Sequence, residues 1–215
     1  MYVQGYKGGH RVSILVCMVR VIIGVDEAGR GPLAGPVAVG VVAISPRLNL
    51  GRIFPELDDS KKLSEKKREE IYAEAVGRAR AGEMSFCTRF SGNAYIDRFG
   101  ITRAVRRGVW SGVRTLAPDP AEVKVFLDGL LKAPPEYRQE TIIGGDALVP
   151  VISLASIVAK VRRDRLMKHL AQLYPEYFFE QHKGYGTKKH FAAINKFGLC
   201  DIHRHTYCKM LETGA

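Results

Sequence analysis

Residues 21–44 read VIIGVDEAGRGPLAGPVAVGVVAI, two β-branched apolar runs on either side of a segment rich in glycine and proline. The runs at 21–25 and 37–44 have the composition of buried strands. Their short link favours a hairpin-like antiparallel pair. Two acids, Asp26 and Glu27, directly follow the first run. This stretch predicts the first two strands of a sheet, with carboxylates at a strand end.

The apolar pattern of the remaining chain predicts further strands and helices. Strands are expected at 83–90, 123–127 and 141–143, and helices at 60–81, 96–116, 151–174 and 188–196. Three strands with hairpin-type links, followed by strands separated by helices, predict an α/β fold with a five-stranded mixed sheet flanked by helices. We expect one domain over 18–215, preceded by an N-terminal extension at 1–17 whose status is open.

Charge and composition narrow the class of protein. The 215 residues include 33 Lys and Arg against 22 Asp and Glu, and the net charge of +11 favours a polyanion such as nucleic acid. Four scattered cysteines without a CxxC pair indicate a reducing, cytoplasmic setting. No apolar run approaches the ~20 residues of a membrane helix, so no membrane association is expected. Residues 12–19 are mostly apolar, but Arg20 follows without a small-x-small cleavage site, which disfavours a signal peptide.

The acids at strand ends predict a cation site. Asp128 follows the apolar run 123–127 and precedes a glycine, as Asp26 and Glu27 precede Gly29 and Gly31. Adjacent side chains on a strand point to opposite faces, so we expect the chain to leave strand geometry if both acids reach one site. Hard divalent cations prefer carboxylate oxygens and offset the repulsion between them.

Spacing alone leaves a second interpretation open. Acids beside glycines are also common turn residues and helix caps. Asp164 lies between Arg163 and Arg165 in a predicted helix, where a solvated ion pair is the simpler explanation. Periodicity and composition do not decide between these interpretations.

Seven strings, in order, resemble the type 2 ribonuclease H family (ribonuclease HII) in its bacterial form. The resemblance runs from about residue 22 to 207, and DEAGRG and HKGYGT are its most specific parts. The strings are DEAGRGPLAGP at 26–36, DSKKLS at 59–64, LDG at 127–129, ASIVAKV at 155–161, RDRLM at 163–167, HKGYGT at 182–187 and HR at 203–204.

The resemblance implies a ribonuclease H-like fold and an endonuclease acting on RNA–DNA hybrids and on single ribonucleotides in duplex DNA. It implies two Mg²⁺ or Mn²⁺ ions about 4 Å apart at the scissile phosphate, incision 5′ of the ribonucleotide, and 3′-hydroxyl and 5′-phosphate ends. It assigns catalysis and metal binding to Asp26, Glu27, Asp128 and Asp164, which replaces the ion-pair interpretation of Asp164. We expect the enzyme to act as a monomer.

The resemblance also implies how the substrate is chosen. Gly29, Arg30 and Gly31 would sense the ribose 2′-hydroxyl through their backbone groups, and Tyr185 would lie against the sugar of the following deoxynucleotide. A surface-packed loop tyrosine is the alternative for Tyr185. The expected phosphate contacts are Lys61, Lys62, Lys160 and Lys183, although 61–70 is also a plain charged helix face.

Two features depart from the family pattern or suggest other chemistry. Gly144 stands where a lysine is usual, which could weaken substrate binding. Cys200, His203, His205 and Cys208 form C-x₂-H-x-H-x₂-C, but four ligands within nine residues leave little chain to wrap a zinc ion.

Two other functions fit the same residues. One is a nuclease of the same fold that acts on DNA, against which the ribose-sensing segment argues. The other is a nucleic-acid-binding protein without catalysis, against which the retained acids argue.

Overall fold

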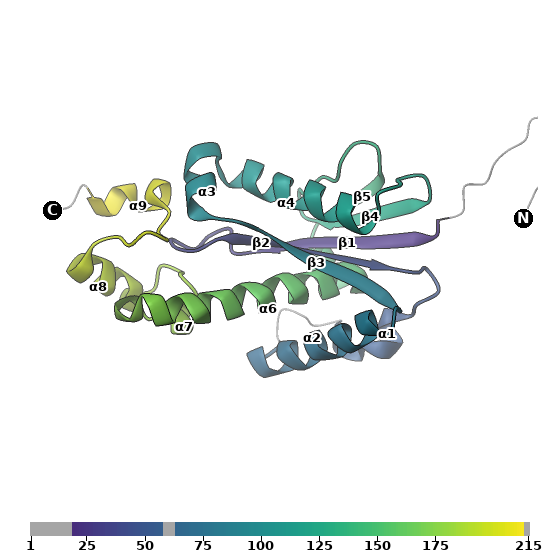
Figure 1. The fold of residues 1–215 in the computed structure, drawn as a ribbon, viewed down its shortest axis with the longest axis horizontal. Helices are drawn as coiled ribbons and strands as arrows, with labels where there is room; N and C mark the ends of the chain where they lie inside the picture. Colours follow the sequence, from purple (N-terminus) through teal and green to yellow (C-terminus); the bar gives the residue numbers. More distant parts are fainter. Residues whose placement is uncertain (1–18, 58–62, 213–215) are drawn as a thin grey trace, which may run out of the picture.

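The computed structural model describes residues 19–57 and 63–212, and side chains as far as residue 209 (Figure 1). The predictions for the extension at 1–17 and for Lys61 and Lys62 lie outside the described residues. Within the described residues, no helix is both long enough and apolar enough to cross a membrane.

A mixed sheet of five strands forms the middle of the molecule. The strands are β1 (Val21–Ala28), β2 (Val37–Ile44), β3 (Met84–Ser91), β4 (Val123–Asp128) and β5 (Arg138–Ile142). Their order is β3-β2-β1-β4-β5. The pairs β1–β2 and β2–β3 are antiparallel, whereas β1–β4 and β4–β5 are parallel. The predicted α/β fold and its antiparallel first pair are confirmed.

Strand β1 extends further than the sequence predicts. Asp26 pairs with Gly40 and Glu27 with Val39, so both acids lie inside the strand. The chain keeps strand geometry at these acids, because β2 is long enough to pair with β1 as far as Ala28. Strand β5 also begins three residues before the predicted 141, where its parallel partner β4 supplies hydrogen bonds that a propensity pattern cannot reveal.

The helices match the predicted periodicity, with one break. The helix at 60–81 is α2 (Glu65–Arg80), and the Ser64 side chain accepts a hydrogen bond from the Lys67 N–H at its start. The helix predicted over 96–116 is two helices, α3 (Asn93–Phe99) and α4 (Ile101–Leu116). Gly100 separates them with φ +80°, a conformation that favours glycine.

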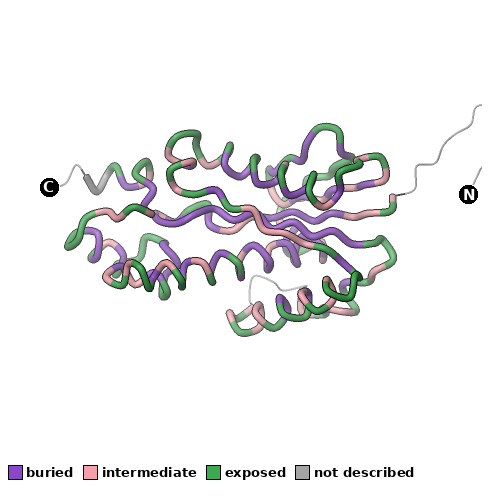
Figure 2. Tube along the Cα trace, viewed as in Figure 1, coloured by how far each residue is buried: buried purple, intermediate pink, exposed green. Residues whose placement is uncertain are grey.

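Helices cover both faces of the sheet (Figure 1). Helices α3 and α4 lie on one face, and α2 and the long α6 (Pro150–Leu173) lie on the other. Figure 2 shows that β1 and β2 are buried along most of their length between these layers. The shorter helices are α1 (Leu50–Ile53), α5 (Gly145–Leu148), the 3₁₀ turn η2 (Pro175–Tyr177), α7 (Phe179–His182), α8 (Lys188–Phe197) and α9 (His205–Glu212).

Two strand glycines let the backbone of α6 lie directly on the sheet. A Cβ atom at Gly24 would lie 2.2 Å from the Val151 carbonyl oxygen, and one at Gly40 would lie 2.1 Å from that of Ala155. These distances are far below van der Waals contact, so only glycine fits. The position of α6 relative to β1 and β2, and hence to the acids, is therefore fixed by backbone contact.

We expect Gly40→Ala to lower the free energy of unfolding by roughly 3 kcal/mol or more, because the new methyl group meets backbone that cannot rotate away. The matched control is Gly77→Ala on α2, where an added Cβ meets nothing within 4 Å. That change should stabilise by roughly 0.5–1 kcal/mol through helix propensity. Urea denaturation measures both, and equal midpoints for the two variants would contradict the close packing.

Candidate active site

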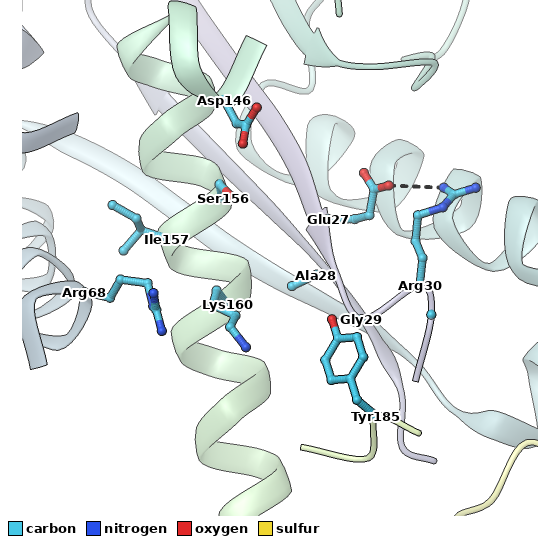
Figure 3. A pocket seen from close by; sticks show the side chains of 11 residues that line it. Glu27, Ala28, Gly29, Arg30, Arg68, Asp146, Ser156, Ile157, Lys160 and Tyr185 are labelled. Atoms are coloured by element: carbon cyan, nitrogen blue, oxygen red, sulfur yellow. Dashed lines mark hydrogen bonds and ion pairs between the residues drawn. The ribbon is translucent and has the colours of Figure 1, made fainter. Parts of the chain in front are cut away.

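Asp26 and Glu27 lie on opposite faces of β1. Asp26 is only 5% exposed and forms a side-chain hydrogen bond with Ser156 on α6. Glu27 accepts a hydrogen bond from the Arg30 guanidinium at 3.1 Å, and its other carboxylate oxygen is buried without a hydrogen-bond partner among the described residues. Figure 3 shows Glu27 and Arg30 on one side of the strand and Ser156 on the other. The acids therefore flank the strand.

Asp128 and Asp146 complete this end of the sheet. Asp128 ends β4, the parallel neighbour of β1. The backbone N–H of Asp146, in α5, donates a hydrogen bond to Asp128 Oδ1 at 3.4 Å. Asp146 is 7% exposed and, with Glu27, lines a hollow of about 380 Å³, here called the central hollow. Sequence reasoning missed Asp146, because it follows Gly145 beyond strand β5 and does not show the acid-before-glycine pattern of the other strand-end acids.

Asp164 lies apart from this group. It follows Ser156 by eight residues on α6, a distance of about 12 Å along the helix axis. Its carboxylate is buried and accepts a hydrogen bond from Lys160 Nζ at 2.8 Å. Asp164 does not line the central hollow. The structure thus shows an ion pair, but a buried one with Lys160 and not the solvated pair that spacing favoured, and it places Asp164 apart from the acids beside the central hollow.

Burial raises the pKa values of Asp26 and Glu27. It raises the pKa of Asp26 from 3.8 to about 8, with further repulsion from Glu27 and Asp128 and partial relief from the Ser156 hydrogen bond. Burial also raises the pKa of Glu27, although Arg30 opposes this. Within the described residues, no three acids, histidines or cysteines converge closely enough to hold a metal ion. The crowded carboxylates and the orphaned Glu27 oxygen nevertheless fit a hard cation, which would relieve this repulsion.

The segment that follows β1 is held by two buried arginines. Arg204 donates to the carbonyl oxygens of Gly29 at 2.7 Å, Arg30 at 2.8 Å and Gly35 at 2.9 Å. Arg163 donates to the Pro36 carbonyl at 2.9 Å. A trans peptide directs its N–H opposite to its C=O. The N–H groups of Arg30 and Gly31 therefore point away from Arg204, at residues that line the central hollow.

Gly29 has φ +90°, and a Cβ atom there would lie 2.0 Å from the Arg163 side chain. Arg163 therefore leaves no room for a side chain at this position, while Arg204 donates a hydrogen bond to the carbonyl of the same residue. The signal in the sequence is the pair of glycines, but nothing in a periodic pattern identifies residues 163 and 204 as their partners.

Tyr185 lines the same hollow. Its ring is 43% exposed and lies 4.0 Å from where a Cβ atom of Gly31 would stand. The backbone of Tyr185 is anchored by its N–H to the His182 carbonyl at 2.9 Å and by its carbonyl to His190 Nδ1 at 3.0 Å. Gly31 and the Tyr185 ring therefore face each other at close range in this hollow.

The predicted lysines have different surroundings. Lys160 lines the central hollow, and so does Arg68, which sequence reasoning missed. Lys183 is nearly buried, donates to the Glu180 carbonyl and does not line the hollow. Among the described residues, only Lys160 of the predicted lysines faces the acids.

The zinc alternative for the C-terminal segment finds no support in its geometry. Cys200 Sγ lies 3.1 Å from His203 Nδ1, but His205 is exposed and Cys208 Sγ lies 4.0 Å from the Leu33 carbonyl. The other ring nitrogen of His203 contacts His190 Nε2 at 3.0 Å. Cys200 and His203 contact each other, but the four side chains form no common centre among the described residues.

Comparison with known proteins agrees with this architecture. The family model described as Ribonuclease HII matches residues 23–210. The ribonuclease HII of Burkholderia thailandensis is 43% identical over 192 residues, covering 89% of this chain and 85% of that protein. The crystal structure of ribonuclease H2 from Pyrococcus horikoshii OT3 has a TM-score of 0.72 at 24% identity, covering 89% and 97% of the two chains. The structure of Bst-RNase HIII in complex with Mn²⁺ has a TM-score of 0.59 at 17% identity, covering 85% and 64%.

The five-stranded sheet and its flanking helices have the ribonuclease H-like fold. Among proteins of that fold, the chain belongs to the ribonuclease HII family, whose members cleave the RNA of RNA–DNA hybrids.

The raised pKa of Asp26 predicts an unusual pH dependence of stability in the absence of metal. The folded state retains a proton that the unfolded state releases, so stability should fall as pH rises from about 4 to about 8. Asp26→Asn should show a shallower fall, because only the contribution of Glu27 remains. Thermal unfolding in EDTA across this range measures the difference. Parallel profiles for the two proteins would contradict the raised pKa.

Proposed function

We propose that this chain is an endonuclease that hydrolyses the RNA strand of RNA–DNA hybrids and incises 5′ of single ribonucleotides in duplex DNA, leaving 3′-hydroxyl and 5′-phosphate ends. The observation that carries this proposal is the central hollow, where carboxylates, the outward backbone N–H groups of Arg30 and Gly31, and the Tyr185 ring lie together. Membership of the ribonuclease HII family supports it.

We assign the metal-binding acids as Asp26, Glu27, Asp128 and Asp146. Asp146 replaces Asp164 because it borders the central hollow beside Asp128, whereas Asp164 is paired with Lys160 further along α6. Two Mg²⁺ or Mn²⁺ ions would supply an activated water and stabilise the departing 3′ oxygen. The Mn²⁺ complex of Bst-RNase HIII supports a divalent metal in this fold.

Arg30 has two partners in this scheme. In the structure its guanidinium neutralises Glu27 at 3.1 Å. When Glu27 binds a cation instead, that guanidinium becomes available, and its planar fork fits a substrate phosphate. Arg30 is about half exposed, so the exchange requires only a side-chain rotation.

Recognition of the ribose is assigned to backbone rather than side chains. The N–H groups of Arg30 and Gly31 approach the hollow without an intervening side chain at Gly31, and can donate hydrogen bonds to a 2′-hydroxyl oxygen. The Tyr185 ring opposite leaves little room for a 2′-hydroxyl on the next sugar, which favours a deoxynucleotide there. Lys160 and Arg68 supply positive charge for nearby phosphates. Lys183 is the weaker candidate for such a contact, because it is nearly buried and holds its own loop.

Two conservative substitutions distinguish the acids. Asp146→Asn should reduce cleavage of a duplex containing one ribonucleotide by about a thousandfold, because it removes a cation ligand. Asp164→Asn should retain activity within about tenfold, since only an ion pair beside the hollow changes. Single-turnover rates with Mg²⁺ and with Mn²⁺ measure both variants. The reverse order of activity would restore Asp164 as the fourth acid.

Cleavage-site mapping tests the substrate class. The wild-type protein should cut 5′ of a single ribonucleotide and should leave an all-DNA duplex of the same sequence intact. Equal cutting of both duplexes would indicate a DNA nuclease of the same fold. Binding without cutting under either metal would indicate a non-catalytic protein.

A further inference from the structure

Helix α4 presents a basic stripe on the side of the sheet opposite α6. Its exposed face carries four arginines around the chain's only tryptophan, and the helix contains no acid. The opposite face of α4 packs on the sheet through Val105, Val109 and Val113. We call the exposed residues the α4 stripe, which consists of Arg103, Arg106, Arg107, Trp110 and Arg114.

The charge of this stripe is mostly unneutralised. Within the part of the chain that the structure describes, no acid lies within ion-pair distance of Arg103, Arg106 or Arg107, while Arg114 pairs with Glu136 at 2.7 Å. The other side of the sheet differs, because several of its basic residues are paired with acids. Its pairs include Lys67 with Glu56, Arg78 with Glu74, Arg165 with Glu69 and Lys168 with Glu65. The arginines of α4 are therefore not explained as part of a solvated helix face on which basic and acidic side chains alternate.

Aromatic rings order the arginines without consuming their donors. The guanidinium carbons of Arg106 and Arg114 lie 5.6 and 5.3 Å from the Trp110 ring, and that of Arg107 lies 4.8 Å from the Tyr95 ring. A cation–π contact uses the face of the guanidinium and leaves its N–H edge available. Side chains already ordered in this way lose less entropy when they bind a phosphate.

The stripe is continuous with the candidate active site. The central hollow shares Glu27 and Arg30 with a second hollow, which Asp128 and Arg106 also line. That second hollow shares Arg106 with a third of about 380 Å³, formed by Tyr95, Trp110 and the other arginines of the stripe. A connected surface therefore runs from the acids to α4.

We propose that the α4 stripe binds the phosphate backbone of the substrate duplex on one flank of the scissile position. This inference rests on the proposed function, because the duplex enters the stripe from the central hollow. Arg103 and Arg114 are about 16 Å apart along the helix axis, which corresponds to about five phosphates of one strand. The planar guanidinium groups can each donate two hydrogen bonds to one phosphate. Because α4 contains no acid, the helix has no negative side chain that would repel the phosphates.

The test uses the full-length protein in EDTA, where no cleavage occurs. Trp110 reports directly on the stripe, so its fluorescence is titrated with two duplexes that contain one ribonucleotide. One spans only the central hollow, and the other extends it by five base pairs at each end. The longer duplex should change the Trp110 emission and bind about tenfold more tightly.

Arg103→Gln/Arg107→Gln should lose most of this length-dependent gain and reduce the slope of log affinity against log salt by about 2. The matched control is Arg52→Gln/Arg80→Gln, which removes two exposed arginines on the opposite side of the sheet and should leave both quantities unchanged. Arg103→Lys/Arg107→Lys should retain most of the salt slope. Circular dichroism confirms that each variant is folded.

Two outcomes separate this inference from the proposed nuclease. An unchanged length-dependent gain and salt slope in Arg103→Gln/Arg107→Gln would overturn the α4 surface, whatever the cleavage rates. Failure of the wild-type protein to cut at a ribonucleotide, with length-dependent binding intact, would overturn the proposed function and leave the α4 surface standing.

Discussion

The candidate site depends on two buried cations that are satisfied by backbone carbonyls. A buried guanidinium is costly unless its N–H groups are hydrogen-bonded. Arg204 meets this requirement with the carbonyls of residues 29, 30 and 35, and Arg163 with those of residues 34 and 36. Burial lowers the pKa of Arg163 to about 10, which still leaves it charged at neutral pH. The segment is therefore folded around positive charge, and its N–H groups are turned outward as a result.

The C-terminal segment supports the same loop through neutral histidines. The rings of His182, His190 and His203 stack in sequence beside Phe179. Burial lowers the pKa of His190 to about 4, so it stays neutral and holds the Tyr185 carbonyl. The pattern that suggested zinc thus includes a residue of this packed cluster, in which ring contacts and hydrogen bonds take the place of a metal. Tyr185 and Gly31 are opposed because both of their segments rest on this region.

The sequence predicts the parts of the fold that depend on local pattern. The apolar runs of β1, β2 and β4 and the periodicity of α6 are each visible within a short window. The apolar periodicity continues on both sides of Gly100, so the sequence predicts one helix where the structure has two. The site is harder, because Asp146 reaches Asp128 through a turn after β5, and Arg204 reaches Gly29 across 175 positions. Such contacts arise from the tertiary arrangement, whereas the resemblance named Tyr185 and four acids directly, with Asp164 where we propose Asp146.

The distance in sequence between Gly29 and Arg204 has a consequence for the order of events during synthesis. The strands that carry Asp26, Glu27 and Asp128 leave the ribosome well before residue 204 is made, and domains fold as their segments emerge. The segment at 29–36 lacks its anchoring cation until residue 204 has been translated. A nascent chain can therefore assemble the strands that carry these acids well before the segment beside them is fixed in place.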